Sequence, residues 1–146
     1  MRSLPRAIAH IDADCFFASV EIAKNPQLAD IPMAVCTRTD NRGIIVSANY
    51  LARPFGLRAG TPLFKARAMC PQLKLVQSNF RDYEEYSDKM FEIFQNTSPD
   101  VEISSIDEAY VDLTGLRLLY RTSHFGIAEK IKNEVFAKLK IPISIG

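Results

Sequence analysis

The segment from residue 103 to 113, Ile-Ser-Ser-Ile-Asp-Glu-Ala-Tyr-Val-Asp-Leu, most constrains how this chain can fold. Both ends are rich in β-branched and aromatic residues, which predicts two short strands joined by a tight turn. Such turns usually contain Asn-Gly or Asp-Gly, because their central residues take positive φ. Here the adjacent carboxylates Asp107 and Glu108 occupy the turn. This departure from the usual turn residues brings no visible local stabilisation, which indicates a functional position. A solvated acidic turn is the structural alternative.

A second acidic strand end lies near the N-terminus. Residues 7–12 form a nearly continuous apolar run that ends at Asp12, as is typical of a central strand buried on both faces. If this strand lies beside the hairpin, the carboxylates of Asp12, Asp107 and Glu108 converge. Three converging carboxylates repel one another unless cations lie between them, so the pattern indicates a cation site.

The composition limits the class of protein. The 146 residues are 47% hydrophobic, enough for one compact core or for a core plus a small lobe. Three widely separated cysteines and two histidines argue against a zinc site and a disulfide framework, and fit a reducing compartment. No apolar run reaches membrane-span length and no signal-peptide core opens the chain, so we expect a soluble cytoplasmic protein with no membrane partner.

The net charge of +1 hides an asymmetry along the chain. Residues 18–77 contain eight Lys and Arg against three Asp and Glu, whereas residues 78–146 contain eight against twelve. A basic segment beside an acidic one suits a phosphate-binding lobe next to a metal-binding lobe. Chance clustering of surface charge gives the same pattern, so the asymmetry alone decides nothing.

The basic segment predicts short elements with clear boundaries. We expect Asp14 to N-cap a helix that runs to Ala23. Residues 32–36 and 43–47 predict a strand pair. Thr61 is expected to cap a further helix that has Pro62 at its first position.

Residues 48–55 predict a short helix that Gly56 ends. Tyr50 and Arg53, three positions apart, would share one face of it. A phenol beside a guanidinium suits an anionic ligand, because Arg binds phosphate in a bidentate manner. A solvated surface pair is the alternative reading of the same spacing.

The remaining chain alternates helices and strands. Apolar residues recur at three- and four-residue spacing over 80–94 and again over 123–139, which predicts two amphipathic helices. Short strands are expected at 73–76 and from Pro142 onward. This order predicts an α+β fold in which helices cover one face of a small, mostly antiparallel sheet, with the basic segment inserted after the first strand.

Three motifs in this order resemble the Y-family translesion DNA polymerases, and most closely their DNA polymerase IV branch. They are Ile-Asp-Ala-Asp-Cys-Phe-Phe-Ala-Ser-Val-Glu at 11–21, Ser-Ala-Asn-Tyr-Leu-Ala-Arg at 47–53, and Ser-Ile-Asp-Glu-Ala-Tyr at 105–110. The resemblance implies a ferredoxin-like polymerase palm, formed by residues 1–17 and 78–146, with a small α/β fingers insertion at 18–77. It also implies an N-terminal fragment that stops before the thumb and little-finger domains.

The resemblance implies roles for the acidic residues. Asp12, Asp107 and Glu108 would be catalytic and would bind two Mg²⁺ ions, with the carbonyl of Ala13 as a further metal ligand. A metal pair about 3.5–4 Å apart activates the attacking hydroxyl and stabilises the leaving oxygen in such reactions.

The resemblance implies roles for three further residues that bind substrate. Tyr50 and Arg53 would hold the incoming triphosphate, and Phe17 would face its sugar. Pro54 stands where a lysine is common in the family, which removes one positive charge near the triphosphate.

The implied function is DNA-directed DNA synthesis across damaged template, by transfer of a nucleotide from a dNTP to a primer 3′-hydroxyl. The implied partners are primer–template DNA, the dNTP and, for a longer protein with a binding tail, a sliding clamp. The chain by itself is expected to be inactive or very weak. Two alternatives remain: a non-catalytic polymerase-like interaction module, and a palm-type nucleotide cyclase, which would lack the basic insertion.

Overall fold

The computed structural model describes residues 4–146, and the chain divides into two compact units. The first unit comprises Met1–Asp14 and Glu84–Gly146, and the second comprises Cys15–Tyr83. The predicted palm and fingers boundaries differ from this division, because residues 15–17 and 78–83 fall in the second unit. The domain assignment therefore stays a prediction.

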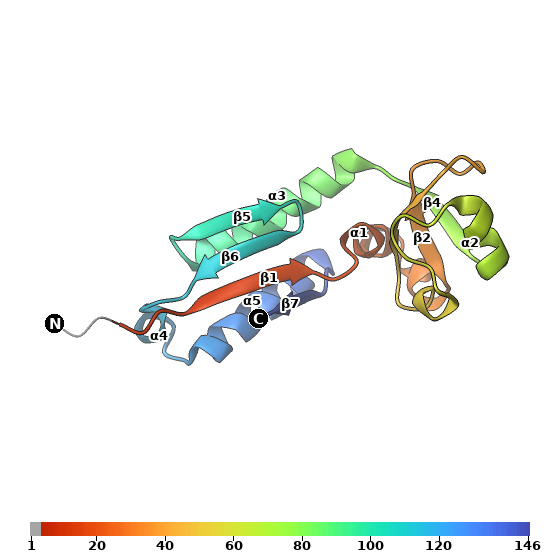
Figure 1. Ribbon diagram of the computed structural model, residues 1–146. Helices are drawn as coiled ribbons and strands as arrows, with labels where there is room; N and C mark the ends of the chain where they lie inside the picture. Colours follow the sequence, from red (N-terminus) through yellow and green to blue (C-terminus); the bar gives the residue numbers. More distant parts are fainter. Residues whose placement is uncertain (1–3) are drawn as a thin grey trace. The chain divides into compact units, whose positions relative to one another are not determined.

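An antiparallel sheet forms the centre of the first unit (Figure 1). Within the described residues its strand order is β5-β6-β1-β7, and every neighbouring pair is antiparallel. The strands are β1 (Ile8–Ala13), β5 (Val101–Ser105), β6 (Glu108–Asp112) and β7 (Ile143–Ile145). The predicted central strand and acidic hairpin are thereby confirmed as sheet neighbours.

The two faces of this sheet differ in polarity. Ile11 and Val111 are fully buried on the face that the helices cover, whereas Asp12 and Tyr110 are exposed on the other. This alternation follows from the two-residue period of a strand. The covering helices are α3 (Phe80–Thr97) and α5 (His124–Leu139), which lie behind the sheet in Figure 1.

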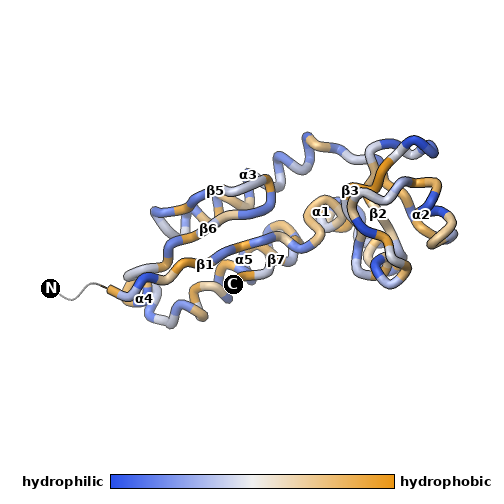
Figure 2. Tube along the Cα trace, in the orientation of Figure 1, coloured by the Kyte–Doolittle hydropathy of each residue, from blue (hydrophilic) through white to orange (hydrophobic). Residues whose placement is uncertain are grey.

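Both long helices follow the predicted periodicity, and hydrophilic and hydrophobic stretches alternate along them in Figure 2. The N-cap of α5 is Ser123, whose side chain accepts a hydrogen bond from Gly126 N at 3.0 Å. A short helix, α4 (Leu116–Tyr120), precedes it and has no counterpart in the predicted elements.

The second unit contains a smaller, mixed sheet of order β3-β2-β4. The predicted strand pair is confirmed as β2 and β3, which are antiparallel, and β4 lies parallel to β2. Its elements are β2 (Met33–Cys36), β3 (Ile45–Ala48), β4 (Lys74–Gln77), α1 (Phe16–Lys24), α2 (Leu63–Met69) and the 3₁₀ helices η1 (Pro26–Asp30) and η2 (Arg53–Phe55).

The predicted N-cap of the first helix is wrong. Cys15, not Asp14, holds the cap position of α1, with φ of 44° and no capping bond from its side chain. Asp14 is instead held by the first unit, because its N–H donates to the Pro142 carbonyl at 3.0 Å and its carboxylate accepts from Ser144 Oγ at 2.6 Å.

Two further local predictions also need correction. Residues 48–55 form a turn followed by η2 instead of an α-helix, and Pro54, which lacks an N–H, lies inside this short segment. Gly56 ends it with φ of 86°, as predicted. The cap position of α2 belongs to Pro62, while the Thr61 hydroxyl donates to the Arg58 carbonyl at 2.8 Å.

Candidate active site

The acidic turn between β5 and β6 is built without positive φ. Among the described residues, the non-glycine positions with positive φ are Cys15, Arg121 and Lys140, none of them in this turn. A register shift between Ile103 and Ser105 absorbs the irregularity instead. This bulged geometry explains why the turn needs neither Asn nor Gly.

Side chains on both sides hold the turn in place. The Ser87 hydroxyl of α3 donates a hydrogen bond to the Ile106 carbonyl, and Ser105 Oγ donates to Asp107 Oδ1 at 2.9 Å. The Asp107 carbonyl accepts from Ala13 N at 3.0 Å. The turn is therefore fixed to the end of β1.

The strand register places the predicted carboxylates side by side at one end of the two inner strands, β1 and β6. Asp12 and Glu108 are direct partners in the β1–β6 ladder, so Glu108 belongs to β6 and not, as predicted, to the turn, which Ile106 and Asp107 form. Residues directly opposite each other on antiparallel strands have Cβ atoms about 4.5–5.5 Å apart and share one face. That face is the open one, so the carboxylates are accessible from solvent.

The electrostatics agree with this geometry. The pKa of Asp12 is raised, first by partial burial and then by the negative charges of Asp107, Glu108 and Asp14, while His10 opposes the shift. Like charges raise a carboxyl pKa because they penalise ionisation. A nearby cation would therefore reduce the repulsion that Asp12 experiences.

His10 is a site residue that was not among the predicted ones. Its Nε2 lies 2.5 Å from Glu108 Oε1, and its ring stacks on Tyr110 with centroids 4.7 Å apart. His10 lies two positions before Asp12, so the strand period places both side chains on the same face. That spacing is the signal that would have found it.

The donor chemistry suits a hard divalent cation, because all three predicted side-chain ligands are carboxylates. In the part of the chain that the structure describes, however, no three His, Cys, Asp or Glu side chains are gathered closely enough to hold a metal ion. The contacts explain this: Glu108 faces His10 and Asp107 bonds to Ser105. The carboxylates would have to turn toward one another to share an ion.

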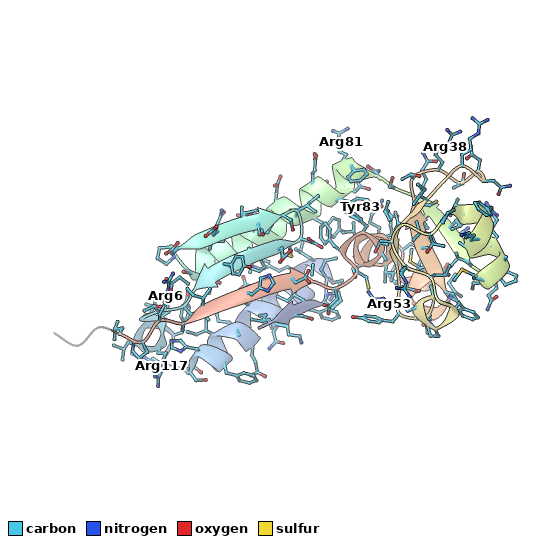
Figure 3. The ribbon with its side chains drawn as sticks, in the orientation of Figure 1. Arg6, Arg38, Arg53, Arg81, Tyr83 and Arg117 are labelled. Carbon is cyan, nitrogen blue, oxygen red and sulfur yellow. The ribbon has the colours of Figure 1, made fainter. Side chains whose placement is uncertain are left out.

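The second unit contains the predicted phosphate-binding pair. The guanidinium carbon of Arg53 lies 4.6 Å from the centre of the Tyr50 ring, and Arg53 Nη2 lies 2.7 Å from Cys15 Sγ. Both side chains are exposed, and Figure 3 labels Arg53. Their expected proximity therefore holds even though the predicted helix does not form.

A buried asparagine missed by the sequence reasoning fixes this turn. Asn49 Oδ1 accepts from the backbone N–H groups of Met33 and Ala52, each at 3.1 Å. Its Nδ2 donates to the carbonyls of Ile31 at 2.8 Å and Leu28 at 3.5 Å. An Asn directly after a buried strand, in a motif that has binding residues next to it, was the available signal.

Phe17 lies within an aromatic cluster of the second unit. Its ring stacks on Tyr83 with centroids 4.7 Å apart and meets Phe80 at 5.5 Å. Phe16 is buried, as the core interpretation predicts, whereas Phe17 is only half-buried. One part of the Phe17 ring is therefore available to a ligand.

Comparison with known proteins identifies the family. The profile of the impB/mucB/samB family matches residues 11–146. The chain belongs to this family. DNA polymerase IV of Dehalococcoides mccartyi is 40% identical over 141 residues, which is 97% of this chain and 36% of that protein. DNA polymerase IV of Escherichia coli is also 40% identical, over 97% of this chain and 40% of its own length.

Solved structures give the same result for the fold. A Y-family DNA polymerase chimera matches with a TM-score of 0.86 and 33% identity, over 95% of this chain and 41% of the chimera. DinB from Sulfolobus solfataricus matches with a TM-score of 0.84 and 32% identity, over the same shares. The Y-family resemblance and the palm–fingers fold are therefore confirmed, and the chain spans about two fifths of the relatives it matches.

None of the helices within residues 4–146 is long and apolar enough to cross a membrane.

Proposed function

We propose that this chain carries the catalytic region of a translesion DNA polymerase, which transfers a nucleotide from a dNTP to a primer 3′-hydroxyl. The observation that carries the proposal is the pairing of Asp12 with Glu108 beside the Asp107 turn. Membership of the impB/mucB/samB family supports it, as do relatives named DNA polymerase IV and a structural neighbour described as an insertion ternary complex of a DNA polymerase.

In this proposal Asp12, Asp107 and Glu108 bind two Mg²⁺ ions, and the Ala13 carbonyl is a further ligand. The ions supply activation of the attacking hydroxyl and stabilisation of the leaving oxygen. The raised pKa of Asp12 supports the assignment, because a bound cation would relieve the repulsion among these carboxylates. The contact between His10 Nε2 and the Glu108 carboxylate would break when that carboxylate binds an ion.

Tyr50 and Arg53 bind the triphosphate in this proposal, and Phe17 contacts its sugar. Arg53 suits the role because its guanidinium is exposed, always charged and able to bind phosphate oxygens in pairs. Primer–template DNA is the macromolecular partner. A sliding clamp, which the Y-family resemblance implies for the longer proteins, is a further proposed partner.

A chimera tests the proposal directly. This chain would replace the matching part of the Escherichia coli relative, and primer extension would be measured with Asp107→Asn and with Glu108→Gln. Loss of one electrostatic stabiliser of a transition state typically costs about 100- to 1,000-fold in rate, so we expect losses of at least this size. The matched control is Glu102→Gln, a carboxylate change on β5 away from the turn. Full activity in both site variants would refute the catalytic assignment.

A non-catalytic polymerase-like module is the second candidate. It is favoured by one observation, that within residues 4–146 no three-ligand metal group is assembled. Mn²⁺ titration of the chain distinguishes the two candidates, because paramagnetic broadening of amide signals needs no catalysis. Broadening confined to residues near Asp12 and Glu108 supports the polymerase, and broadening spread evenly over surface carboxylates supports the module.

A further inference from the structure

A groove on the first unit has no part in the proposed chemistry. It lies where the chain before β1, α4 and the start of α5 meet, and its volume is about 700 Å³. Ligand-binding pockets commonly have volumes of about 300–1,000 Å³. Its lining combines the apolar side chains of Leu4, Pro5 and Leu118 with the basic side chains of Arg117, Arg121 and His124.

Hydrogen bonds hold the walls of this groove together. Ala7 N donates to Thr114 Oγ1 at 3.0 Å, and the Ala7 carbonyl accepts from Leu113 N at 2.8 Å. These bonds tie the residues before β1 to the residues before α4. The Tyr120 hydroxyl at the end of α4 donates to the Thr97 carbonyl at 2.5 Å. The groove is therefore a formed feature of the first unit.

The groove has unbalanced positive charge. Within residues 4–146, the guanidinium groups of Arg117 and Arg121 make no hydrogen bond or ion pair, and no acidic side chain lines the groove. Arg117 extends from α4 at the surface of the first unit (Figure 3). The first turn of α5 contains no acid that would offset the positive end of its dipole.

A histidine adds a second polar feature. The Nε2 atom of His124 is buried and has no hydrogen-bond partner within the described part of the chain. A buried polar atom without a partner costs free energy. His124 is the first residue of α5, so the groove gathers three basic side chains and a helix N-terminus in a segment that is acidic as a whole.

Large apolar side chains are exposed on the same short segment of the chain. Leu118 is 87% exposed, Leu119 70% and Phe125 72%. Single exposed apolar residues are ordinary, but a cluster bordered by polar groups is typical of a protein-interaction site. The three residues lie on α4 and the first turn of α5, next to the two arginines.

We propose that this groove binds an acidic peptide segment of a partner protein. Its carboxylates pair with Arg117 and Arg121 through charge-assisted hydrogen bonds, and an apolar side chain of the peptide packs on Leu118 and on the Leu4–Pro5 wall. A nucleic-acid backbone fits less well, because it has phosphates but no apolar group to cover these leucines. Two arginines would also give only weak binding to phosphates, because the affinity for a nucleic-acid backbone grows with the number of phosphates contacted.

A random heptapeptide library displayed on phage, selected against the immobilised chain, tests the proposal. We expect enriched sequences that combine Asp or Glu with Leu or Phe. The strongest peptide, made synthetically, would then be titrated by fluorescence anisotropy. The double variant Arg117→Glu/Arg121→Glu and the single variant Leu118→Ser should each weaken its binding at least tenfold.

Matched controls separate the groove from general surface effects. Lys132→Glu reverses an exposed charge on α5 outside the groove, and Phe64→Ser removes an exposed apolar side chain from the second unit. Both should leave peptide binding unchanged. All substituted side chains are exposed, and amide NMR spectra would verify that each variant is folded.

Three results would overturn the proposal. The first is a selection without a shared acidic and apolar sequence, and the second is binding that the groove variants do not weaken. The third is that a single-stranded heptanucleotide binds the chain as tightly as the peptide does and displaces it. That result would assign the groove to nucleic-acid phosphates. None of these outcomes depends on polymerase activity.

Discussion

At the scale of single residues, Asp12 lies in an environment that opposes its charge. Its pKa is above the ordinary 3.8, through partial burial and the neighbouring carboxylates. A pKa that is higher in the folded than in the unfolded state stabilises the fold at low pH. That stabilisation is lost as the pH rises through the folded-state value.

Asp12→Asn should therefore raise the melting temperature at pH 7 and have little effect near about pH 3, where the native carboxyl is already protonated. Thermal unfolding followed by circular dichroism at both pH values checks this. Asp30→Asn, a change at an exposed carboxylate of η1, is the control and should give no gain. An equal rise at both pH values would mean that charge repulsion is not the cause.

Phe17 gives a second prediction at the residue scale. Its stacking on Tyr83 and contact with Phe80 are each worth about 0.5–1.5 kcal/mol, so Phe17→Ala should lower the free energy of unfolding by a few kcal/mol. In the polymerase chimera the same change should raise the ratio of ribonucleotide to deoxyribonucleotide incorporation. A bulky apolar ring excludes a 2′-hydroxyl by clash and leaves it without a hydrogen bond, a loss of about 1–3 kcal/mol.

The two readouts distinguish the roles of this ring. Tyr83→Phe is a useful control, because it keeps the aromatic stack and removes the hydroxyl that donates to Glu21 Oε1 at 3.2 Å. It should lower stability without changing sugar choice. If Phe17→Ala lowers stability and leaves the incorporation ratio unchanged, Phe17 is a packing residue only.

At the scale of elements, one side chain organises the second unit. Asn49 joins η1, β2 and the turn that carries Tyr50 and Arg53. It is buried, with 6% of its surface exposed, so its partners cannot turn to water when it is removed. The placement of Arg53 therefore depends on a residue that touches no proposed substrate.

Asn49→Ala should lower the free energy of unfolding by about 2–4 kcal/mol, because buried backbone groups lose their partners. Chemical denaturation of the chain measures the loss. Asn49→Asp is the matched control: it keeps the acceptor for Met33 N and Ala52 N, replaces the donor with a second oxygen, and adds a charge. It should be less destabilising than alanine; the opposite order would show that burial of charge outweighs these acceptor bonds.

At the scale of the whole molecule, charge limits what the chain can do alone. Its net charge is only +1, and its excess of basic residues is confined to residues 18–77, which contain eight Lys and Arg against three Asp and Glu. Phosphate contacts provide much of the affinity of proteins for DNA. Weak binding to primer–template DNA is the expected result.

We accordingly predict little or no processive primer extension by the 146-residue chain. We expect the chimera with the Escherichia coli relative to extend primers well, because it supplies the part of a DNA polymerase IV that this chain does not match. Gel-based extension assays of both proteins at equal concentration provide the comparison. Robust extension by the chain alone would contradict the prediction, and a steep fall of its DNA affinity with salt would show more phosphate contacts than we expect.

Much of this protein was determined by its sequence alone. The residues at 103–113 predict a hairpin, and the apolar run ending at Asp12 predicts a buried central strand; the β1–β6 register then brings their carboxylates together. The three- and four-residue spacing over residues 80–94 and 123–139 specifies the helices that cover the sheet. These elements were predictable because the periodicity that defines a strand or a helix is a local property of the sequence and does not depend on distant residues.

The tertiary structure decided what depends on partners distant in sequence. Asp14 is held by Pro142 and Ser144, so it cannot cap α1, and Cys15 takes a left-handed conformation in its place. The hydrogen bond between His10 and Glu108 depends on the pairing register of β1 with β6, which cannot be predicted from a local sequence pattern. A local sequence gives each residue its preferences, but only the assembled fold determines which donor reaches which acceptor.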